Sequence, residues 1–358
     1  MKAAVQGNAA AQNNLGSCNR DGRGIAKNEE EAVKWYKLAA KQGHATAQSN
    51  LGFCYQYNRG VVKNAEAVKW YKLAAKQGHA TAQNNLGECY HYGRGVVKNA
   101  EEAVKWYRLA AEQGDANAQN NLGVCYQYGI GVAKNSDEEF NWYKLAADQG
   151  NMYAQSSLGY CYQHGIGVVK NDDEAAKWFQ LSADQGYMNA QSNLGCCYRE
   201  GRGVVKNEKE AVKWFKLATE QGHADAQYGL GYCYFHGIGV AKDDEESFKW
   251  IKLAAEQGYM NAQYGLGYYY QQGVGVAKND DEAVKWFQLV ADQGLSDAKF
   301  QLAQIYENKK KKLLIEAAAQ GHVDAQIYLD SKYKRKQNPT TNDVNTSKRN
   351  CVDGIRVL

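Results

Sequence analysis

Apolar residues in the third repeating segment of the chain follow helical spacing. Ala82, Leu86 and Cys89 lie three or four positions apart, which places them on one face of a helix predicted over roughly 81–92. Gly93 follows, and glycine readily ends a helix in a left-handed turn. The pattern therefore predicts a short helix with one buried face, followed by a tight glycine loop.

A second helix is predicted after this loop. Asn99 is a favourable N-cap, and Glu102 three residues later completes a capping-box pattern. Gly114 supplies the stop. The apolar face is expected to contain Ala103, Trp106 and Ala110, with Leu109 beside them. Loss of such a tryptophan would cost about 3–5 kcal/mol if its side chain is buried.

This pair of helices recurs along most of the chain. The tryptophans stand 35 and then 36 residues apart, at Trp35, Trp70, Trp106, Trp142, Trp178, Trp214, Trp250 and Trp286. A Leu-Gly pair recurs in step, at Leu15, Leu51, Leu86, Leu122, Leu158, Leu194, Leu230 and Leu266. One helical pair cannot bury its own apolar face, so the repeats are expected to stack around a continuous core.

The N-cap pattern recurs with the repeats. Its other members are Asn28/Glu31, Asn135/Glu138, Asn171/Glu174, Asn207/Glu210, Asp243/Glu246 and Asn279/Glu282. In the second repeat one residue is missing, and Asn64 precedes Glu66 by only two positions. We therefore expect an altered loop or helix start there.

Composition and charge narrow the class of protein. Of 358 residues 23% are charged, the net charge is +4, and aromatic residues make up 12%. This content excludes a highly charged disordered chain and lacks the basic excess of a dedicated nucleic-acid binder. No segment approaches 18 apolar residues, and the N-terminus lacks the apolar core of a signal peptide. A cytoplasmic protein is the expectation.

The repeated residues carry a family resemblance. The pattern is Ala-x-Ala-Gln-x-x-Leu-Gly-x-Cys-Tyr-x-x-Gly-x-Gly-Val-x-Lys-Asn-x-x-Glu-Ala-Val-Lys-Trp-Tyr-x-Leu-Ala-Ala-x-Gln-Gly, and it covers about Lys2 to Leu329. It resembles the Sel-one-like repeats, relatives of tetratricopeptide repeats. The resemblance implies an all-α fold, an α/α superhelical solenoid of about eight 36-residue helix-turn-helix repeats with a degenerate C-terminal capping repeat. It also implies a scaffold or adaptor for protein complexes.

The two ends of the array differ from its middle. Residues 1–14 align with the end of a second helix, so we expect a partial repeat whose beginning is missing, either a fragment or a lost upstream sequence. Eight repeats follow over 15–301, and 302–333 is a degenerate capping repeat in which Lys309–Lys312 replaces the glycine loop. There a short helix over 313–319 and a final one over 324–332 are expected. Residues 334–358 are predicted to be a disordered basic tail.

The basic residues near the C-terminus leave their role open. Lys309–Lys312 and the run 332–336 could address a nucleus, an anionic membrane or nucleic acid. Such runs are more often solvated helix ends. We therefore expect no nucleic-acid partner, and a nuclear location stays an alternative that rests on the tail.

The cysteines form a ladder at one position of the repeat. Its members are Cys18, Cys54, Cys89, Cys125, Cys161, Cys197 and Cys233, and Tyr269 takes the place in the eighth repeat. Stacked helical pairs lie roughly 10 Å apart, beyond the Cα separation of about 7 Å that a disulfide allows. Paired C-x-x-C spacing is missing, so zinc is not expected. Buried core thiols are the favoured interpretation, and a redox role for the vicinal pair Cys196-Cys197 is the weaker one.

The remaining chemistry offers no enzyme constellation. His44, His79, His223 and His322 share a position with Asp115, Asn151 and Tyr187, which indicates a helix-connecting surface site rather than a catalytic or metal site. His164 and His236, at the end of the first helix, are expected to be solvated. The Gly-x-Gly loops lack the strand and the lysine of a phosphate loop. We predict no catalytic residue, no cofactor and no metal.

Residues that differ between repeats identify a candidate binding face. On the first helix the register of Thr46, Ser49, Phe53 and Gln56 lies within roughly 80° of arc, away from the constant residues. By resemblance, this face lines the concave groove. Aromatic residues gather on it in the later repeats, and aromatics are enriched in binding hot spots. The candidate partner-binding residues are Tyr160, Tyr228, Tyr232, Phe235, Tyr264 and Tyr268. The competing interpretation is that these rings pack between repeats.

The function favoured by these observations is that of a non-catalytic, monomeric scaffold with a protein or peptide in its groove, serving a regulatory or complex-assembly role. One alternative is an enzyme resembling the cysteine-rich, β-lactam-binding and hydrolysing members of the family. Those members carry two cysteines per repeat, whereas this chain carries one. Another alternative is an array that regulates a catalytic domain absent from this sequence.

Overall fold

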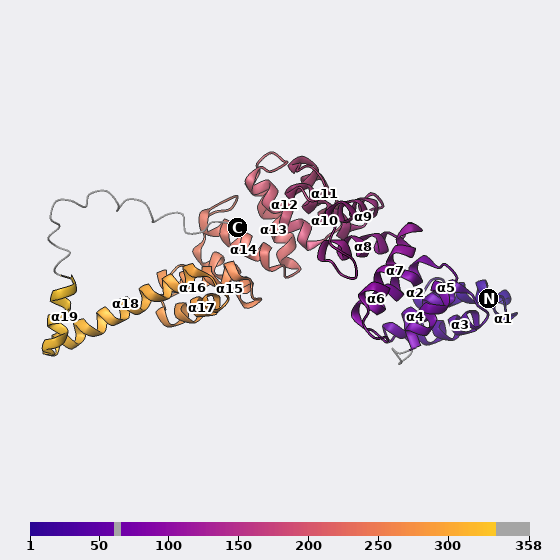
Figure 1. Ribbon diagram of the computed structural model, residues 1–358, viewed down its shortest axis with the longest axis horizontal. Helices are drawn as coiled ribbons and strands as arrows, with labels where there is room; N and C mark the ends of the chain where they lie inside the picture. The colour runs from indigo at the N-terminus through magenta and orange to yellow at the C-terminus, as the bar shows by residue number, and fades with distance from the viewer. Residues whose placement is uncertain (61–65, 334–358) are drawn as a thin grey trace. The chain divides into compact units, whose positions relative to one another are not determined.

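The computed structural model describes residues 1–60 and 66–333. Within them every regular element is a helix and no strand occurs, so the predicted all-α solenoid is confirmed. Two compact units divide the chain, 1–241 and 242–358, and within each unit consecutive helices pack against one another (Figure 1). No helix in the described ranges is long and apolar enough to span a membrane.

Each repeat contributes two helices of about three turns. The first helices are α2 (Ala9–Asp21), α4 (Ala45–Gln56), α6 (Ala80–Tyr92), α8 (Ala116–Tyr128), α10 (Met152–His164), α12 (Met188–Glu200), α14 (Ala224–His236) and α16 (Met260–Gln272). The second helices are α3 (Glu29–Lys41), α5 (Ala67–Lys76), α7 (Ala100–Glu112), α9 (Ser136–Asp148), α11 (Asp172–Asp184), α13 (Glu208–Glu220), α15 (Asp244–Glu256) and α17 (Asp280–Asp292). A single turn, α1 (Lys2–Val5), precedes them, and α18 (Ser296–Ala319) and α19 (Val323–Tyr333) follow.

The start of the second helix is fixed by its N-cap, as predicted. Asn99 Oδ1 accepts a hydrogen bond from the backbone N–H of Glu102 at 3.0 Å. The capping box, however, is only half formed. The backbone N–H of Asn99 donates to the Tyr90 carbonyl at 2.9 Å, and the Glu102 carboxylate lies 3.4 Å from Lys105 Nζ. In a complete capping box the Glu102 carboxylate would accept from the Asn99 N–H. Here the carboxylate pairs with Lys105, and the N–H donates to the preceding helix instead.

The second repeat departs from the others, as its missing residue predicts. Helix α5 has 10 residues, where α3 and α7 have 13, and its N-cap Glu66 makes no side-chain capping bond. Asn58 adopts a left-handed φ of 53° where the next repeat has Gly93 with φ 71°. Asn64 lies outside the described residues.

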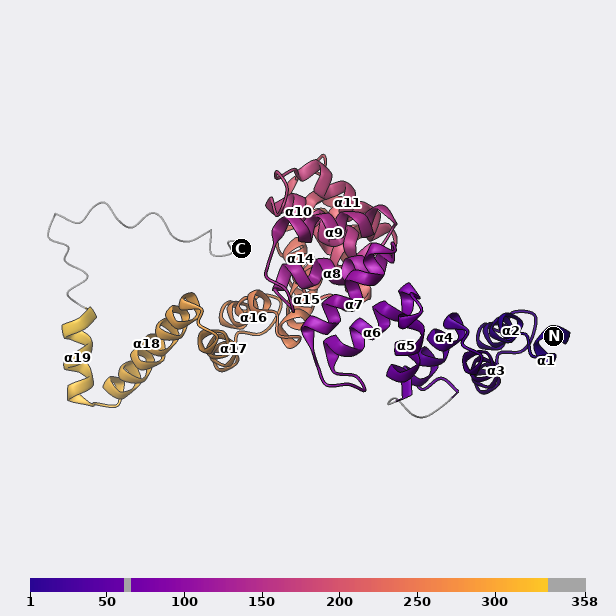
Figure 2. The same cartoon turned by 45° about the vertical axis from the view of Figure 1, so that its right-hand side comes forward.

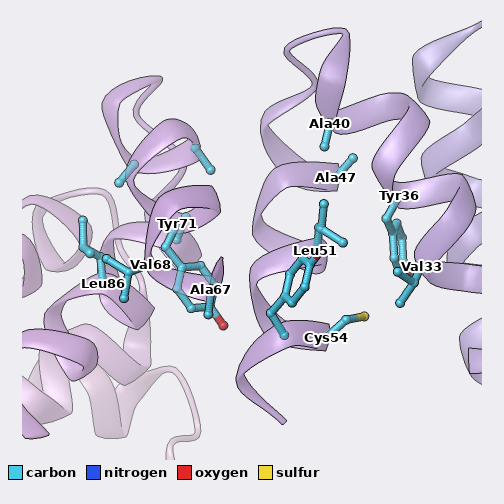
Figure 3. Close-up of a cluster of buried hydrophobic side chains, with 14 of the residues drawn as sticks. Val33, Tyr36, Ala40, Ala47, Leu51, Cys54, Ala67, Val68, Tyr71 and Leu86 are labelled. Atoms are coloured by element: carbon cyan, nitrogen blue, oxygen red, sulfur yellow. The ribbon is translucent and has the colours of Figure 1, made fainter. Parts of the chain in front are cut away.

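The buried centre of each repeat is the residue that follows the tryptophan. Six of these side chains are among the largest fully buried ones: Tyr36, Tyr71, Tyr143, Phe179, Phe215 and Phe287. In Figure 3 Leu51 of α4 lies between Tyr36 of α3 and Tyr71 of α5. The tryptophans are only partly buried, except for Trp214. Trp106 packs against the core as predicted but is only partly buried, because the helix is rotated to turn the next residue, Tyr107, fully inward.

Each buried ring fits against a glycine of the first helix. A Cβ atom added at Gly123 would lie 2.6 Å from the ring of Tyr143, so any larger residue would collide with it. The same geometry recurs for Gly16–Tyr36, Gly52–Tyr71, Gly87–Tyr107, Gly159–Phe179, Gly195–Phe215 and Gly267–Phe287. The glycine of the Leu-Gly pair thus provides the space that lets the two helices of a repeat approach closely.

Buried glutamines link three successive helices. Gln48 of α4 donates from Nε2 to the Ala40 carbonyl of α3 at 3.1 Å, and its Oε1 accepts from Gln77 Nε2 of α5 at 2.7 Å. The glutamine-to-glutamine bond recurs as Gln42–Gln12, Gln113–Gln83, Gln149–Gln119, Gln185–Gln155, Gln221–Gln191 and Gln293–Gln263. These amides have their donor and acceptor satisfied inside the protein, which makes their burial acceptable.

The ninth segment differs from its prediction. The expected separate helix over 313–319 is wrong, because α18 continues without interruption from Ser296 through Lys309–Lys312 to Ala319. With the glycine loop gone, nothing ends the first helix, and lysine is a good helix former. The predicted final helix is confirmed as α19, and the predicted tail, 334–358, lies outside the described residues.

We predict opposite effects for two glycine-to-alanine substitutions in first helices. Gly123→Ala should lower the free energy of unfolding by about 1–3 kcal/mol, because the added methyl group overpacks the Tyr143 ring. Gly265→Ala should raise it by up to about 1 kcal/mol, since the methyl group would meet Ile251 at an ordinary 3.7 Å and alanine favours the helix. Denaturant unfolding followed by circular dichroism measures both changes, and equal effects would contradict the proposed fit of ring and glycine.

Candidate partner-binding surface

The first helix separates constant residues from variable ones. Ala47, Leu51 and Cys54 are buried in the core, whereas Thr46 is exposed and Phe53 is partly exposed. One position departs from the expected variable face. Ser49 is buried, so residues in its register have less access to a partner than the sequence pattern indicates.

The predicted aromatic residues lie in both compact units. Tyr160 lies on α10, while Tyr228, Tyr232 and Phe235 share α14. Tyr264 and Tyr268 lie on α16, in the second unit. Tyr160 and Tyr268 are exposed, and the other four are partly buried.

Tyr264 packs inward more than its register predicts. Its ring centroid lies 5.4 Å from that of Phe287, the buried ring of the same repeat. Burial raises the pKa of the Tyr264 hydroxyl above its ordinary value. This residue therefore fits the packing interpretation better than the binding one.

An ordered cluster surrounds Tyr232 in the sixth and seventh repeats. The guanidinium carbon of Arg199 lies 5.5 Å from the centroid of the Tyr232 ring and 5.8 Å from that of the Phe215 ring. Its Nη2 donates to Glu200 Oε1 at 2.6 Å, and only 10% of the Arg199 side chain is exposed. Cys196, predicted at an exposed position, is partly buried with its Sγ 3.9 Å from Arg199 Nη2. The Tyr232 ring therefore packs against an arginine that is itself mostly buried and paired with Glu200.

Histidines stack on two of the candidate tyrosines. The ring centroids of Tyr160 and His164 are 4.2 Å apart, and those of Tyr232 and His236 are 4.3 Å apart. Both histidines are exposed, as predicted. Residues four apart on a helix lie on the same side, so each pair presents one aromatic surface.

Another row of tyrosines was missed by the sequence analysis. Tyr57, Tyr92 and Tyr128 lie at the ends of the first helices of repeats two to four, and all are exposed, Tyr92 by 59%. The Arg94 guanidinium carbon lies 4.6 Å from the Tyr92 ring centroid. The sequence feature that could have identified this row is a tyrosine directly before the left-handed residue that ends the first helix. It extends the aromatic surface toward the early repeats.

The histidines that follow Gln-Gly are helix caps. His79 Nδ1 accepts a hydrogen bond from the Ala82 N–H at 3.2 Å, and Asp115 caps the next first helix in the same way. The other histidine caps are His44, His223 and His322. Tyr187 makes no side-chain capping bond. Tolerance at this position thus reflects a shared capping role rather than catalysis.

The cysteine ladder lies in the core. From Cys54 to Cys233 its thiols are buried and free, and none of the described cysteines forms a disulfide. Burial raises the pKa of Cys54, Cys89 and Cys125 to about 11. Burial raises the pKa of Cys161, Cys197 and Cys233 to about 12. Thiols with such pKa values stay protonated at neutral pH, which makes them inert packing groups.

Metal-ligating side chains do not gather in the described part of the chain. Among residues 1–60 and 66–333, no group of three or more His, Cys, Asp and Glu side chains could hold an ion. The glycine loops that the structure describes end helices and follow no strand. The side chains that the first-helix face offers to a partner are therefore aromatic rings and the charged groups beside them.

Sequence comparison now identifies the repeats. The Sel1 repeat pattern matches eight times, over 9–44, 45–79, 80–115, 116–151, 153–187, 189–223, 224–259 and 261–295. The chain belongs to the Sel1 repeat family. Sel1 repeat proteins are generally protein-interaction scaffolds and are mostly non-catalytic. Among curated proteins, no relative matches the chain.

Solved Sel1 repeat structures share this fold. The chain is similar to c5321, a protective antigen of uropathogenic Escherichia coli, with 38% identity over 92% of this chain and 73% of that one and a TM-score of 0.72. It is also similar to a Sel1 repeat protein from Oxalobacter formigenes, with 35% identity over 68% of this chain and 96% of that one and a TM-score of 0.63.

The histidine caps predict a pH dependence of stability. Burial lowers the pKa of His79 and of His223 below the ordinary value of about 6.5. The unfolded chain therefore binds these protons first, so stability is complete above about pH 6.5 and falls as the pH drops toward the native pKa values. A protonated Nδ1 can no longer accept the capping bond, which contributes on the order of 1 kcal/mol per cap.

Thermal melts at pH 7 and pH 5 test this prediction. The double variant His79→Asn and His223→Asn keeps both caps, because Asn151 caps α10 from the same position. It should lose less stability than the wild type between the two pH values. An unchanged pH dependence would rule out the histidine caps as its source.

Proposed function

We propose that the chain is a non-catalytic scaffold that binds a protein or peptide along the first-helix face, in the concave groove, as a regulatory or complex-assembly subunit. The observation that carries this proposal is the aromatic surface of Tyr160 and Tyr232, on a face where residues differ from repeat to repeat. Packing residues repeat along the array, while this face changes and can specify a partner.

The chemistry of the face favours protein over nucleic acid. Aromatic rings held by neighbouring side chains supply contact area at low entropic cost, as in binding hot spots. Arg199 and Arg202 share the carboxylate of Glu200, so this part of the face carries little excess positive charge for phosphate groups. A cytoplasmic location accords with buried, free thiols.

The enzyme alternative finds less support. Single buried cysteines, free in the described repeats, differ from the two bridged cysteines that mark the β-lactam-binding members. A regulatory array for a separate catalytic domain remains compatible with the scaffold proposal, since both require the same partner face.

Affinity capture with crosslinking and mass spectrometry identifies the partner, and titration calorimetry then tests the face. The triple variant Tyr160→Ala, Tyr232→Ala and Tyr268→Ala should weaken binding by at least tenfold, because hot-spot residues contribute about 2 kcal/mol or more each. The matched control replaces exposed leucines of the second helices, Leu145, Leu181 and Leu289, with alanine and should leave affinity unchanged.

Two outcomes would contradict the proposal as stated. Unchanged affinity of a folded triple variant would remove these rings from the interface. A loss confined to the variant Tyr57→Ala, Tyr92→Ala and Tyr128→Ala would move the interface to repeats two to four. Circular dichroism melts of every variant separate loss of binding from loss of fold.

A further inference from the structure

The ninth repeat has lost the loop that makes a repeat fold back. In the first repeat the glutamine after the second helix, Gln42, lies 24 positions beyond the cysteine-ladder residue Cys18. In the ninth repeat the separation between Ile305 and Gln320 is 15 positions. In complete repeats the two helices run antiparallel, since Gln12 near the start of α2 bonds Gln42 beyond the end of α3. In the ninth the corresponding segments join end to end as α18.

Helix α19 packs against the second half of α18 in the part of the chain that the structure describes. Figure 2 shows α18 as one continuous helix with α19 at its far end. Lys332 of α19 lies 2.7 Å from Glu307 Oε1, and Lys310 Nζ lies 5.0 Å from the centroid of the Tyr328 ring. Helix α19 thus takes the place of the next repeat's first helix. No helix in the described ranges takes the place of this repeat's own first helix, because the first half of α18 continues straight into the second half.

Positions that are buried in complete repeats are open here. Ala39 and Ala40 are fully buried in α3, whereas their counterparts Ala317 and Ala318 are only partly buried. On the other half of α18, Ala303 is exposed, although its counterparts Gly16 and Gly52 are buried. Leu314, which takes the position of the fully buried Tyr36, is likewise only partly buried.

The two open faces match each other in size. Ala303 takes the position of the glycine, and Leu314 takes the position of the buried ring. Leu314 is smaller than the aromatic ring it replaces, and Ala303 leaves less space than the glycine it replaces. The summed volume of the two side chains therefore stays suited to packing. The two residues are 11 positions apart on one helix, about 16 Å along its axis, so they cannot meet within one copy.

We propose that a second copy of this chain completes the ninth repeat by reciprocal exchange. Two α18 helices lie antiparallel, so that Ala303 of each copy packs against Leu314 of the other. The two-fold axis passes between Asn308 and Lys309. Each copy then supplies the first helix for its partner's second helix, as in domain swapping, where a lost hinge loop prevents closure within one copy. The dimer replaces the monomer expected from the sequence.

The lysine run lies at this axis and sets a condition on the dimer. Lys309 pairs with Asp281 at 2.6 Å, and Lys310 lies against the Tyr328 ring. These contacts within one copy offset part of the repulsion between the two runs. Salt screens the rest, so association should strengthen as ionic strength rises.

Sedimentation and light scattering of the full-length chain across a dilution series test the exchange. The wild type should form a dimer. Ala303→Arg alone and Leu314→Asp alone should each shift the protein to monomer, because each homodimer would contain two mismatched contacts. Mixed in equal amounts, the two variants should form a heterodimer, in which the introduced arginine pairs with the introduced aspartate and the other contact stays native. This recovery is specific to reciprocal pairing of these positions.

A loop insertion supplies an independent variant. A copy of the loop 93–99 inserted after Asn308 should let the second half fold back on its own first half and yield a monomer. A wild type that stays monomeric at every concentration and salt level would overturn the proposal. So would single variants that dimerise as the wild type does, or a mixture without heterodimer. Circular dichroism melts confirm that each variant is folded.

Discussion

The whole array depends on one contact, the aromatic ring of a second helix lying against a glycine of the first. At Gly123 and Tyr143 the two helices approach so closely that even a methyl group would collide with the ring. This contact sets the distance between the helices, and the neighbouring tryptophan packs partly buried against the core. Packing then extends from repeat to repeat through the small, constant residues around it. The fold therefore depends on the missing side chain of the glycine as much as on the aromatic ring that fills its place.

The buried glutamines add direction to this packing. Gln48 joins the carbonyl end of α3 to Gln77 of α5, so three helices share one chain of hydrogen bonds. Removing the Gln48 amide would cost both bonds but leave neither partner unsatisfied, because the Ala40 carbonyl also accepts from the Gly43 N–H at 3.0 Å and Gln77 also donates to the Leu73 carbonyl at 3.3 Å. Apolar packing alone would tolerate helices that slide past each other, whereas this chain holds them in one register.

Periodicity was sufficient to predict the solenoid, the helix caps and the buried thiols. It could not decide which of Trp106 and Tyr107 is buried more deeply, because adjacent residues on a helix differ in direction by about 100° and both side chains are large and apolar. Whether Tyr264 points toward a partner or toward Phe287 likewise depends on packing that register alone does not fix. At Lys309–Lys312 a change in composition suggested a break, yet nothing in four lysines stops a helix. These misses share a cause, since neighbouring helices decide what a local pattern leaves open.

The ring-and-glycine contact lies inside each repeat, while the link from Gln48 to Ala40 crosses a junction that recurs along the array. Most junctions share this glutamine link, although some add a buried pair of their own, as Ser247 and Tyr269 do at 2.7 Å. Duplication or loss of a whole unit during evolution would change the length of the protein while leaving its interior intact. Recombination between units would reorder the outward-facing aromatics in the same way. The interior contacts that recur from repeat to repeat therefore let the outward-facing residues change while the fold stays the same.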